Sequence, residues 1–528
     1  MNDVITGIMS VAEGEPERIA IVDGRGREIS YAELARRVNA VRDAMTGRLH
    51  TTTTRTGAAA GQPDATTTRA GAAAGLSGDG VLFAVRPGVD AVALALGAVA
   101  AGGTLVLADP GLAPEVLTAR MAATRPSWVI AESLLYTLSG PFKGLARRRG
   151  LLLPNLRDPL PGRPVRHLYT GPWLPGVPRG ALRLSRLLHP VTGPADMSDA
   201  KAPDISEISA NQAAAVIFTS GTTARPRGVV HTRGSLAAGL ELFRSAFPLE
   251  PGDIVHTDQL MLGLPALLAG ATWSLPGNGD LADELATRRA THAFAVPVHL
   301  DRLLRRTPRL PETLRYLLLG AAPAPPAVLR RAMEAGPEVL SVYAMTEALP
   351  IAVASAREKL AQAEGDLLGA PLPGVGVRIA DDGELFVSGP HLARRYLGEE
   401  PLREVATGDL VRLEEGRLVL LGRKKDMILR DGVNIYPGLY EPAVAALPGV
   451  AEAAIVGLAD PETGDEEVVL AVIPAGDYDE GLLRKALPEI VDASALPDRI
   501  EPLDAFPRSG RADKLDRAAL RELVARRA

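Results

Sequence analysis

The stretch FTSGTTARPRG, residues 218–228, combines small, hydroxyl-bearing and basic residues in an order that suits phosphate oxygens. Glycine lets backbone N–H groups approach an anion closely, and serine and threonine hydroxyls add further donors. The apolar run VIF at 216–218 predicts a buried strand directly before the glycine and hydroxyl residues, and Arg227 supplies a fixed cation after them. The spacing differs from G-x-x-x-x-G-K-S/T, the usual nucleotide loop. The stretch therefore predicts a phosphate-binding loop of another kind, with a surface turn as the alternative.

Three further motifs, in chain order, offer groups that suit a nucleotide. They are GAAP at 320–323, YAMTE at 343–347 and TGD at 407–409. Tyr343 offers an aromatic face for a base, and Glu347 offers a hard carboxylate for a hard cation such as Mg²⁺. Taken singly, each motif is short enough to occur by chance, and its charges are equally typical of solvated surface groups.

Two longer segments complete the pattern near the C-terminal end. They are GRKKDMILRDGVNIYP at 422–437 and PRSGRADKLDRAAL at 507–520. Together the motifs span most of the chain and resemble the adenylate-forming superfamily, which contains acyl-CoA synthetases, aryl-CoA ligases, nonribosomal-peptide adenylation domains and luciferases. The chain looks most similar to the acyl-CoA ligases of that superfamily.

The resemblance implies a role for each matching residue. Tyr343 would stack on adenine, Asp409 would accept both ribose hydroxyls, and Arg423 would touch the ribose. Glu347 would reach Mg²⁺, and Lys514 would be the catalytic lysine. The other implied positions are the catalytic Thr219 and Arg227, the hinge Lys425, and the nucleotide-binding Thr219, Ser220, Gly221, Thr222, Thr223, Gly320, Ala321, Ala322, Pro323, Ala344, Met345 and Thr346.

Several positions depart from the pattern of the family. Ala224 and Ala344 stand where the family has glycine, and Arg227 stands where it has lysine. Arginine keeps the charge but presents it as a planar fork. Lys514 comes about one residue late in the C-terminal motif, and Asp513 replaces a glycine there. These departures leave open a non-enzymatic alternative, a degenerate fold that acts as a binding subunit.

The implied reaction joins two anions, a carboxylate and the α-phosphate of ATP, so the site must cancel their repulsion. Mg²⁺ at Glu347, the cradle at 219–223, Arg227 and Lys514 would supply that cancellation. An acyl-adenylate and pyrophosphate would form first. The C-terminal domain would then rotate about Lys425 and present the mixed anhydride to the thiol of CoA, or of a phosphopantetheinyl carrier protein.

The acid-binding pocket is expected to be apolar. Its predicted wall residues are Leu260, Met261, Leu262, Phe294, Val296, Met345 and Leu349. No aspartate stands where it would clearly pair an amino-acid ammonium, which favours an apolar carboxylic acid. The shortened segment 253–276 and TEALP at 346–350 also resemble the β-lactone synthetases, so cyclisation of a β-hydroxy acid stays open. Within that segment, His256 is expected to be a partly exposed histidine at a strand end.

Alternating strand-like and helical runs, from residue 80 to about 340, predict an α/β fold with parallel sheets and covering helices. Short strands at 383–421 predict a small antiparallel β-region. We expect a large N-terminal domain over 1–423 with a flexible repeat insertion at about 50–78. A small mobile α+β domain is expected over 424–528.

Composition excludes several classes of function. The chain has 528 residues, no cysteine and a formal net charge of −5. Disulfides, thiolate catalysis and zinc–thiolate sites are therefore excluded, and the negative net charge argues against a nucleic-acid binder, which would usually show a basic stripe. The uncharged run at 91–108 is broken by two glycines and predicts a buried helix, turn and strand, not a membrane span. The N-terminus has no secretory signal pattern, so a cytoplasmic enzyme is expected. The Arg- and Pro-rich stretch 143–190 is expected to be a solvated connection, with a docking loop as the alternative.

Overall fold

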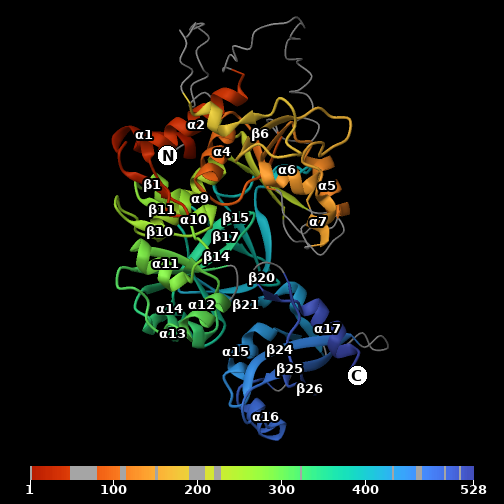
Figure 1. The fold of residues 1–528 in the computed structure, drawn as a ribbon. Coiled ribbons are helices and arrows are strands. Elements are labelled where there is room, and N and C mark those ends of the chain that lie inside the picture. Colours follow the sequence, from red (N-terminus) through yellow and green to blue (C-terminus); the bar gives the residue numbers. More distant parts are fainter. Residues whose placement is uncertain are drawn as a thin grey trace, which may run out of the picture. The chain divides into compact units, whose positions relative to one another are not determined.

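Figure 1 shows a computed structural model of the chain, coloured from red at the N-terminus to blue at the C-terminus. The structure describes residues 3–47, 80–107, 114–148, 153–189, 209–218, 227–320, 324–430, 433–459, 466–492, 495–509 and 513–527. These residues form two compact units. The first comprises Met1–Thr291, Thr346–Leu349 and Pro390–Arg403, and the second comprises His292–Met345, Pro350–Gly389 and Glu404–Ala528. The predicted repeat insertion lies outside the described residues, and the predicted domain boundary after residue 423 stays a prediction.

An eight-stranded sheet in the first unit has the order β19-β9-β8-β4-β3-β5-β6-β7. Pairing is parallel from β8 through β7, whereas β9 is antiparallel to both β8 and β19. The predicted parallel α/β fold is confirmed. β6 and β7 fall inside 143–190, where the sequence predicts only a connection, because proline and arginine surround these short runs. The bounds are β3 Gly80–Ala84, β4 Thr104–Leu107, β5 Trp128–Glu132, β6 Arg166–Thr170, β7 Leu182–Arg183, β8 Ala213–Phe218, β9 Gly228–Thr232 and β19 Arg395–Tyr396.

Four further strands of the first unit are neighbours in the order β10-β11-β1-β2. Their bounds are β1 Ile19–Val22, β2 Glu28–Ser30, β10 Ile254–His256 and β11 Thr272–Ser274. Helices of the unit are α1 Val4–Gly14, α2 Tyr31–Met45, α4 Val89–Ala100, α5 Pro114–Thr124, α6 Ser133–Ser139, α7 Lys143–Arg148, α8 Leu184–Leu187, α9 Arg233–Ala246, α10 Leu260–Leu268 and α11 Leu281–Arg288.

The described residues of the uncharged run at 91–108 belong to α4, a turn and β4, as predicted. Gly102 adopts φ +86° at the turn, a left-handed conformation that glycine takes without strain. Among the described residues, no helix is long and apolar enough to cross a membrane.

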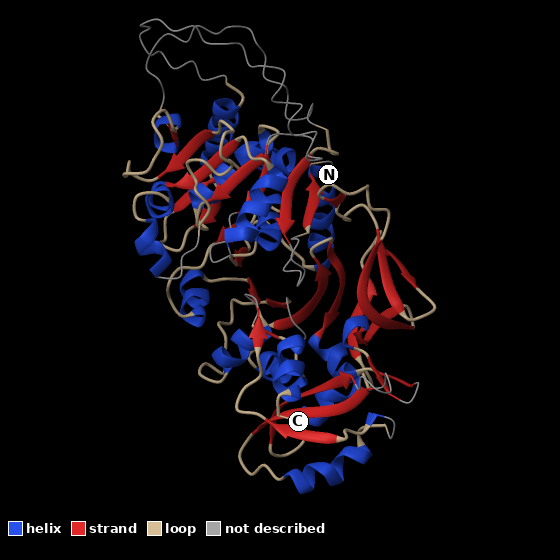
Figure 2. Cartoon of the chain, turned by 90° about the vertical axis from the view of Figure 1, so that its right-hand side faces the viewer, coloured by secondary structure: helices blue, strands red, loops and turns tan. Residues whose placement is uncertain are grey.

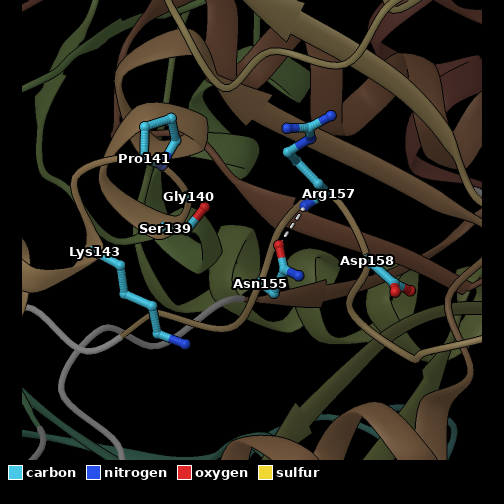
Figure 3. A pocket seen from close by; sticks show the side chains of 7 residues that line it. All are labelled: Ser139, Gly140, Pro141, Lys143, Asn155, Arg157 and Asp158. Carbon is cyan, nitrogen blue, oxygen red and sulfur yellow. Dashed lines mark hydrogen bonds between the residues drawn. The ribbon is translucent and has the colours of Figure 1, made fainter.

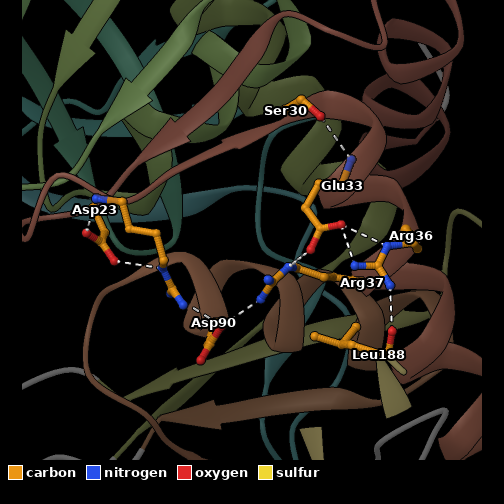
Figure 4. A network of polar contacts seen from close by, with 8 residues as sticks. Asp23, Ser30, Glu33, Arg36, Arg37, Asp90 and Leu188 are labelled. Atoms are coloured by element: carbon orange, nitrogen blue, oxygen red, sulfur yellow. Dashed lines mark hydrogen bonds and ion pairs between the residues drawn. The ribbon is translucent and has the colours of Figure 1, made fainter. Parts of the chain in front are cut away.

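A polar network joins α2 to α4 (Figure 4). The hydroxyl oxygen of Ser30 accepts the backbone N–H of Glu33 at 3.3 Å, so Ser30 caps the N-terminus of α2. Arg37 donates to Glu33 within the helix at 2.6 Å and to Asp90 of α4 at 2.9 Å. The first turns of both helices are therefore held by shared ionic partners.

A buried ion pair joins the N-terminus of the described chain to α9. Arg233, at the first position of α9, is fully buried, and its Nε donates to Oδ1 of Asp3 at 2.7 Å. Asp3 also caps α1 by accepting the backbone N–H of Thr6 at 3.0 Å. One carboxylate therefore fixes the starts of two helices.

The second unit contains strands in the order β17-β18-β20-β21-β16-β15-β14-β13-β12. β12, β13 and β14 run parallel, and the pairs from β15 to β17 are antiparallel. The predicted antiparallel β-region is confirmed. The bounds are β12 His292–Ala295, β13 Tyr316–Leu319, β14 Glu338–Met345, β15 Ala348–Ser355, β16 Asp366–Pro371, β17 Gly376–Ile379, β18 Glu384–Ser388, β20 Val405–Glu414, β21 Arg417–Arg423, α12 Pro297–Leu304, α13 Pro326–Glu334 and α14 Ala356–Ala361.

The C-terminal part of the second unit has its own apolar core, which includes Ile455, Val468 and Leu470. Strands β24, β25 and β26 form a sheet there, and Figure 2 shows strands in red and helices in blue. The predicted α+β character of this segment is confirmed. The bounds are β22 Ile428–Arg430, β23 Val433–Ile435, α15 Pro437–Ala445, β24 Val450–Ala459, β25 Glu466–Pro474, α16 Glu480–Ala486, β26 Arg499–Pro502, β27 Arg508–Ser509, β28 Lys514–Leu515 and α17 Arg517–Ala525.

Candidate functional site

The predicted phosphate loop is anchored by two antiparallel strands. β8 ends at Phe218 and β9 begins at Gly228, and these two residues are partners in the sheet. Five predicted loop residues, and three from the predicted adenine-side loop, lie outside the described residues. They are Thr219, Ser220, Gly221, Thr222, Thr223, Ala321, Ala322 and Pro323. The structure thus describes the two ends of the phosphate loop, and the roles of the residues between them stay predictions.

Arg227 and Glu347, both predicted site residues, meet the same tyrosine. The guanidinium carbon of Arg227 lies 3.7 Å from the ring centroid of Tyr396. The hydroxyl of Tyr396 donates to Oε1 of Glu347 at 2.9 Å. Burial and the charge of Glu347 raise the pKa of Tyr396 to about 12, so the hydroxyl keeps its proton. The sequence motifs gave no sign of Tyr396, which lies 49 residues after Glu347.

The backbone of Thr346 is held by a buried histidine. Nε2 of His231 lies 2.7 Å from the carbonyl oxygen of Thr346, and Nδ1 lies 3.2 Å from the hydroxyl of Ser235. Burial lowers the pKa of His231, so the ring is neutral and Nε2 carries the proton that it donates to the carbonyl. His231 therefore connects α9 to the YAMTE motif.

Tyr343 and Arg423 both contact the carboxylate of Asp409, and the nucleotide-binding roles of all three residues stay predictions. The hydroxyl of Tyr343 donates to Oδ2 of Asp409 at 2.7 Å, and Nε of Arg423 lies 2.8 Å from Oδ1. Asp409 is 3% exposed and faces Arg423 across β20 and β21. Burial, together with the charge of Asp409, raises the pKa of Tyr343. Two predicted nucleotide-binding residues, Tyr343 and Arg423, therefore converge on the carboxylate of a third, Asp409.

Lys514 lies in β28, paired with Ser509 of β27. Partial burial lowers its pKa, and the positive charge of Arg423 adds to this shift, while Asp409 opposes it. The preceding residue, Asp513, adopts φ +50°, the left-handed conformation that suits the glycine found there in the family. The lysine therefore lies within electrostatic reach of the Asp409 cluster.

The predicted hinge residue, Lys425, lies in a short 3₁₀ turn at Lys424–Asp426. Its neighbour Lys424 donates to Asp382 at 2.6 Å and to Glu384 at 2.8 Å. These hydrogen bonds raise the pKa of Lys424. The residue beside the predicted hinge is thus tied to β18, and the hinge role of Lys425 stays a prediction.

The predicted acid-pocket residues divide between the two units. In the first unit, Leu260, Met261 and Leu262 open α10, and a Cβ added at Gly239 of α9 would collide with the carbonyl oxygen of Leu349 and lie 3.6 Å from Met261 Cε. In the second unit, Phe294 lies in β12, and a Cβ at Gly320 would be 3.1 Å from its ring. The remaining two are Val296, which directly precedes α12, and Met345, the last residue of β14.

The expectation of a partly exposed His256 is wrong, because the ring is 1% exposed. It lies 3.0 Å from the hydroxyl of Ser274 and 3.3 Å from Oε2 of Glu284. Since Ser274 is also fully buried, no substrate can reach its hydroxyl. This serine, histidine and glutamate set therefore connects β10, β11 and α11 and is not a nucleophilic site.

The described residues contain no group of three or more histidine, aspartate or glutamate side chains that could by itself hold a metal ion. An open pocket of about 670 Å³ has Lys143, Asn155 and Arg157 on its wall, with the side chains arranged as in Figure 3. None of the predicted site residues lines this pocket.

Family models match both parts of the chain. The AMP-binding enzyme model matches residues 72–397, and the AMP-binding enzyme C-terminal domain model matches residues 440–512. The first match spans more than half of the chain. The chain therefore belongs to the AMP-binding enzyme family, and the predicted resemblance is confirmed.

Individual relatives are ligases or synthetases. A 2-succinylbenzoate–CoA ligase from Bacillus mycoides (strain KBAB4) is 32% identical over 354 residues, which cover 60% of this chain and 72% of that protein. The amide bond synthetase McbA from Marinactinospora thermotolerans has a TM-score of 0.74 and 24% identity, with 99% of both chains covered. O-succinylbenzoate Coenzyme A synthetase (MenE) from Bacillus subtilis, solved with ATP and magnesium ion, has a TM-score of 0.69 and 21% identity, with 96% of this chain and 98% of that chain covered. The two structures share the fold of this chain.

Proposed function

We propose that this protein activates a carboxylic acid with ATP, forms an acyl-adenylate and pyrophosphate, and transfers the acyl group to the thiol of CoA. The observation that carries the proposal is that Tyr343 and Arg423 both contact the buried carboxylate of Asp409. Two hydroxyls of a ribose can donate to such a carboxylate, and the tyrosine ring offers a face to a base. Membership of the AMP-binding enzyme family supports the same reading.

The first step needs positive charge where two anions approach. Arg227 and Lys514 are the cations of this chain that would face the triphosphate and the carboxylate. Glu347 has the hard oxygen donors that Mg²⁺ prefers, and the bound ion would neutralise phosphate charge. The carboxylate oxygen attacks the α-phosphorus, the bond to the bridging oxygen breaks, and pyrophosphate leaves. The thiol sulfur then attacks the acyl carbon, and AMP leaves with the electron pair while the thiol proton is released.

An apolar acid is the substrate class that the predicted wall residues favour. Leucine, methionine and phenylalanine bury apolar surface and offer no charge to an ammonium group. The 2-succinylbenzoate ligase named above acts, by its name, on an acid with a benzene ring and a second carboxylate, so it supports only an aromatic group in the substrate. CoA is the proposed acceptor, and a carrier protein or the hydroxyl of the acid itself are the acceptors that an experiment must separate.

A pyrophosphate-release assay tests the proposal. The chain is incubated with ATP, Mg²⁺ and a panel of fatty, aryl, β-hydroxy and amino acids, each with and without CoA, and acyl-adenylate is trapped with hydroxylamine. We expect release with one class of apolar acid and a thioester product only with CoA. A lactone formed without CoA would contradict the ligase step alone. If no acid of the panel causes pyrophosphate release and calorimetry detects no ATP binding, adenylation is contradicted. The degenerate binding fold is then the alternative that is left.

A further inference from the structure

Tyr396 lies between two residues of the proposed ATP site. It is 7% exposed and belongs to β19, where it faces Val229 of β9. β9 begins at the residue after Arg227, and the N–H of Leu397 donates to the carbonyl of Gly228 at 2.7 Å. The short strand therefore fixes Tyr396 beside the end of the phosphate stretch.

The ring of Tyr396 supports Arg227. The guanidinium carbon lies 3.7 Å from the ring centroid, well inside the range of a cation–π contact. A planar guanidinium can lie flat on a ring face, which an ammonium cannot do. Glu399 adds a second contact, with Oε2 3.4 Å from Nη2 of Arg227. Because the Arg227 side chain is 53% exposed, these contacts orient it while leaving it open to an anion.

The hydroxyl of Tyr396 restrains Glu347. Its hydrogen bond to Oε1, at 2.9 Å, fixes the rotation of a carboxylate that is 8% exposed. The backbone of Glu347 is held by the same segment, because the N–H of Ala393 donates to its carbonyl at 2.7 Å and Ala348 bridges to Leu392. Side chain and backbone of the acidic residue therefore depend on residues 392–396.

We propose that Tyr396 is a positioning residue that couples the binding of Mg²⁺ at Glu347 to the binding of pyrophosphate at Arg227. One face of its ring contacts the Arg227 guanidinium, and its hydroxyl donates a hydrogen bond to the Glu347 carboxylate. Without this spacer the two opposite charges could pair with each other, and both would be lost to the nucleotide. The inference rests on the proposed function, since it assigns Glu347 and Arg227 to ATP.

Two substitutions separate the two contacts. Tyr396→Phe keeps the ring and removes the hydroxyl, whereas Tyr396→Leu removes both. Binding of ATP to the full chain is measured by titration calorimetry over a series of Mg²⁺ concentrations, so that no acid needs to be known. We expect Tyr396→Phe to raise the Mg²⁺ concentration for half-maximal binding about 10- to 100-fold, the usual effect of losing a partner of a metal ligand. Tyr396→Leu should in addition lower the affinity for pyrophosphate, which is measured by its displacement of ATP.

Tyr169→Phe is the matched control, because Tyr169 is equally buried in β6 and its apolar cluster in the described chain contains none of the predicted site residues. It should leave both readouts and the melting temperature as in the wild type. An unchanged Mg²⁺ requirement in Tyr396→Phe overturns the coupling. If the wild type binds no ATP at any Mg²⁺ concentration, the proposed function falls and the coupling falls with it, which is a different result. Should Tyr396→Leu fail to fold, Tyr396→Phe decides alone.

Discussion

Asp409 and Arg423 stand opposite each other on β20 and β21, with Nε of the arginine 2.8 Å from Oδ1 of the aspartate. Tyr343 reaches the other carboxylate oxygen from β14. A buried carboxylate needs such partners, because an unpaired buried charge is costly. The arrangement holds the carboxylate in one orientation before any nucleotide arrives.

Asp409→Asn should weaken ATP binding while the chain stays folded. The amide keeps the shape but loses the charge that would accept the ribose hydroxyls, and a hydrogen bond to a charged group is worth about 1.5–3 kcal/mol. We expect the dissociation constant for ATP to rise roughly 10- to 100-fold by titration calorimetry. Glu404→Gln, at an exposed ion pair with Arg378, is the control and should bind ATP like the wild type. Equal affinity in Asp409→Asn would contradict the ribose role.

Lys514→Ala should separate the two half-reactions. Adenylation should fall on the order of 10²–10³-fold, because one preorganised cation is lost. Thioester formation from supplied acyl-adenylate should be unchanged, since that step would not use the lysine. Pyrophosphate release and thioester formation are measured separately, with the exposed Lys485→Ala of α16 as control. Equal losses in both steps would remove Lys514 from its assigned role.

Asp3→Asn should destabilise the chain strongly, although Asp3 is remote in sequence from its partner. The substitution leaves Arg233 buried and charged without its carboxylate, which typically costs about 3–5 kcal/mol. Chemical denaturation measures the change in the free energy of unfolding. Arg233→Met combined with Asp3→Asn should recover part of the loss, because no buried charge remains. A double variant less stable than Asp3→Asn alone would contradict this explanation.

His167→Gln should reduce the loss of stability in acid. Burial, followed by the charge of Arg157, lowers the pKa of His167 from 6.5 to about 4. Between these values the unfolded chain binds more protons than the folded chain, so the free energy of unfolding falls as the pH falls from 6.5 to 4. We expect the variant to lose about 1–2 kcal/mol less than the wild type, allowing for partial exposure of the ring. The exposed His189→Gln is the control, and parallel pH curves for both variants would contradict the prediction.

The sequence predicted those parts of the site that are local in the chain. TGD and GRKKD each contain one partner of the Asp409–Arg423 pair, and a hairpin of adjacent strands brings them together. Tyr396 was missed because its contact with Glu347 depends on β19 pairing with β9, a long-range pairing that leaves no periodic signal. His256 was misjudged for the same reason, since the residues that bury it come from β11 and α11.

Gly239 limits how the wall of the predicted acid pocket can change in evolution. Any side chain at this position would strike the carbonyl oxygen of Leu349, a backbone atom that cannot rotate away. In the predicted acid pocket, changes in the size of the acid would therefore arise at neighbouring side chains such as Met261, whose flexible thioether adapts to different shapes. A mutagenesis library should therefore contain folded variants at position 261 but only glycine at position 239. Selection for new substrates would then act on few positions.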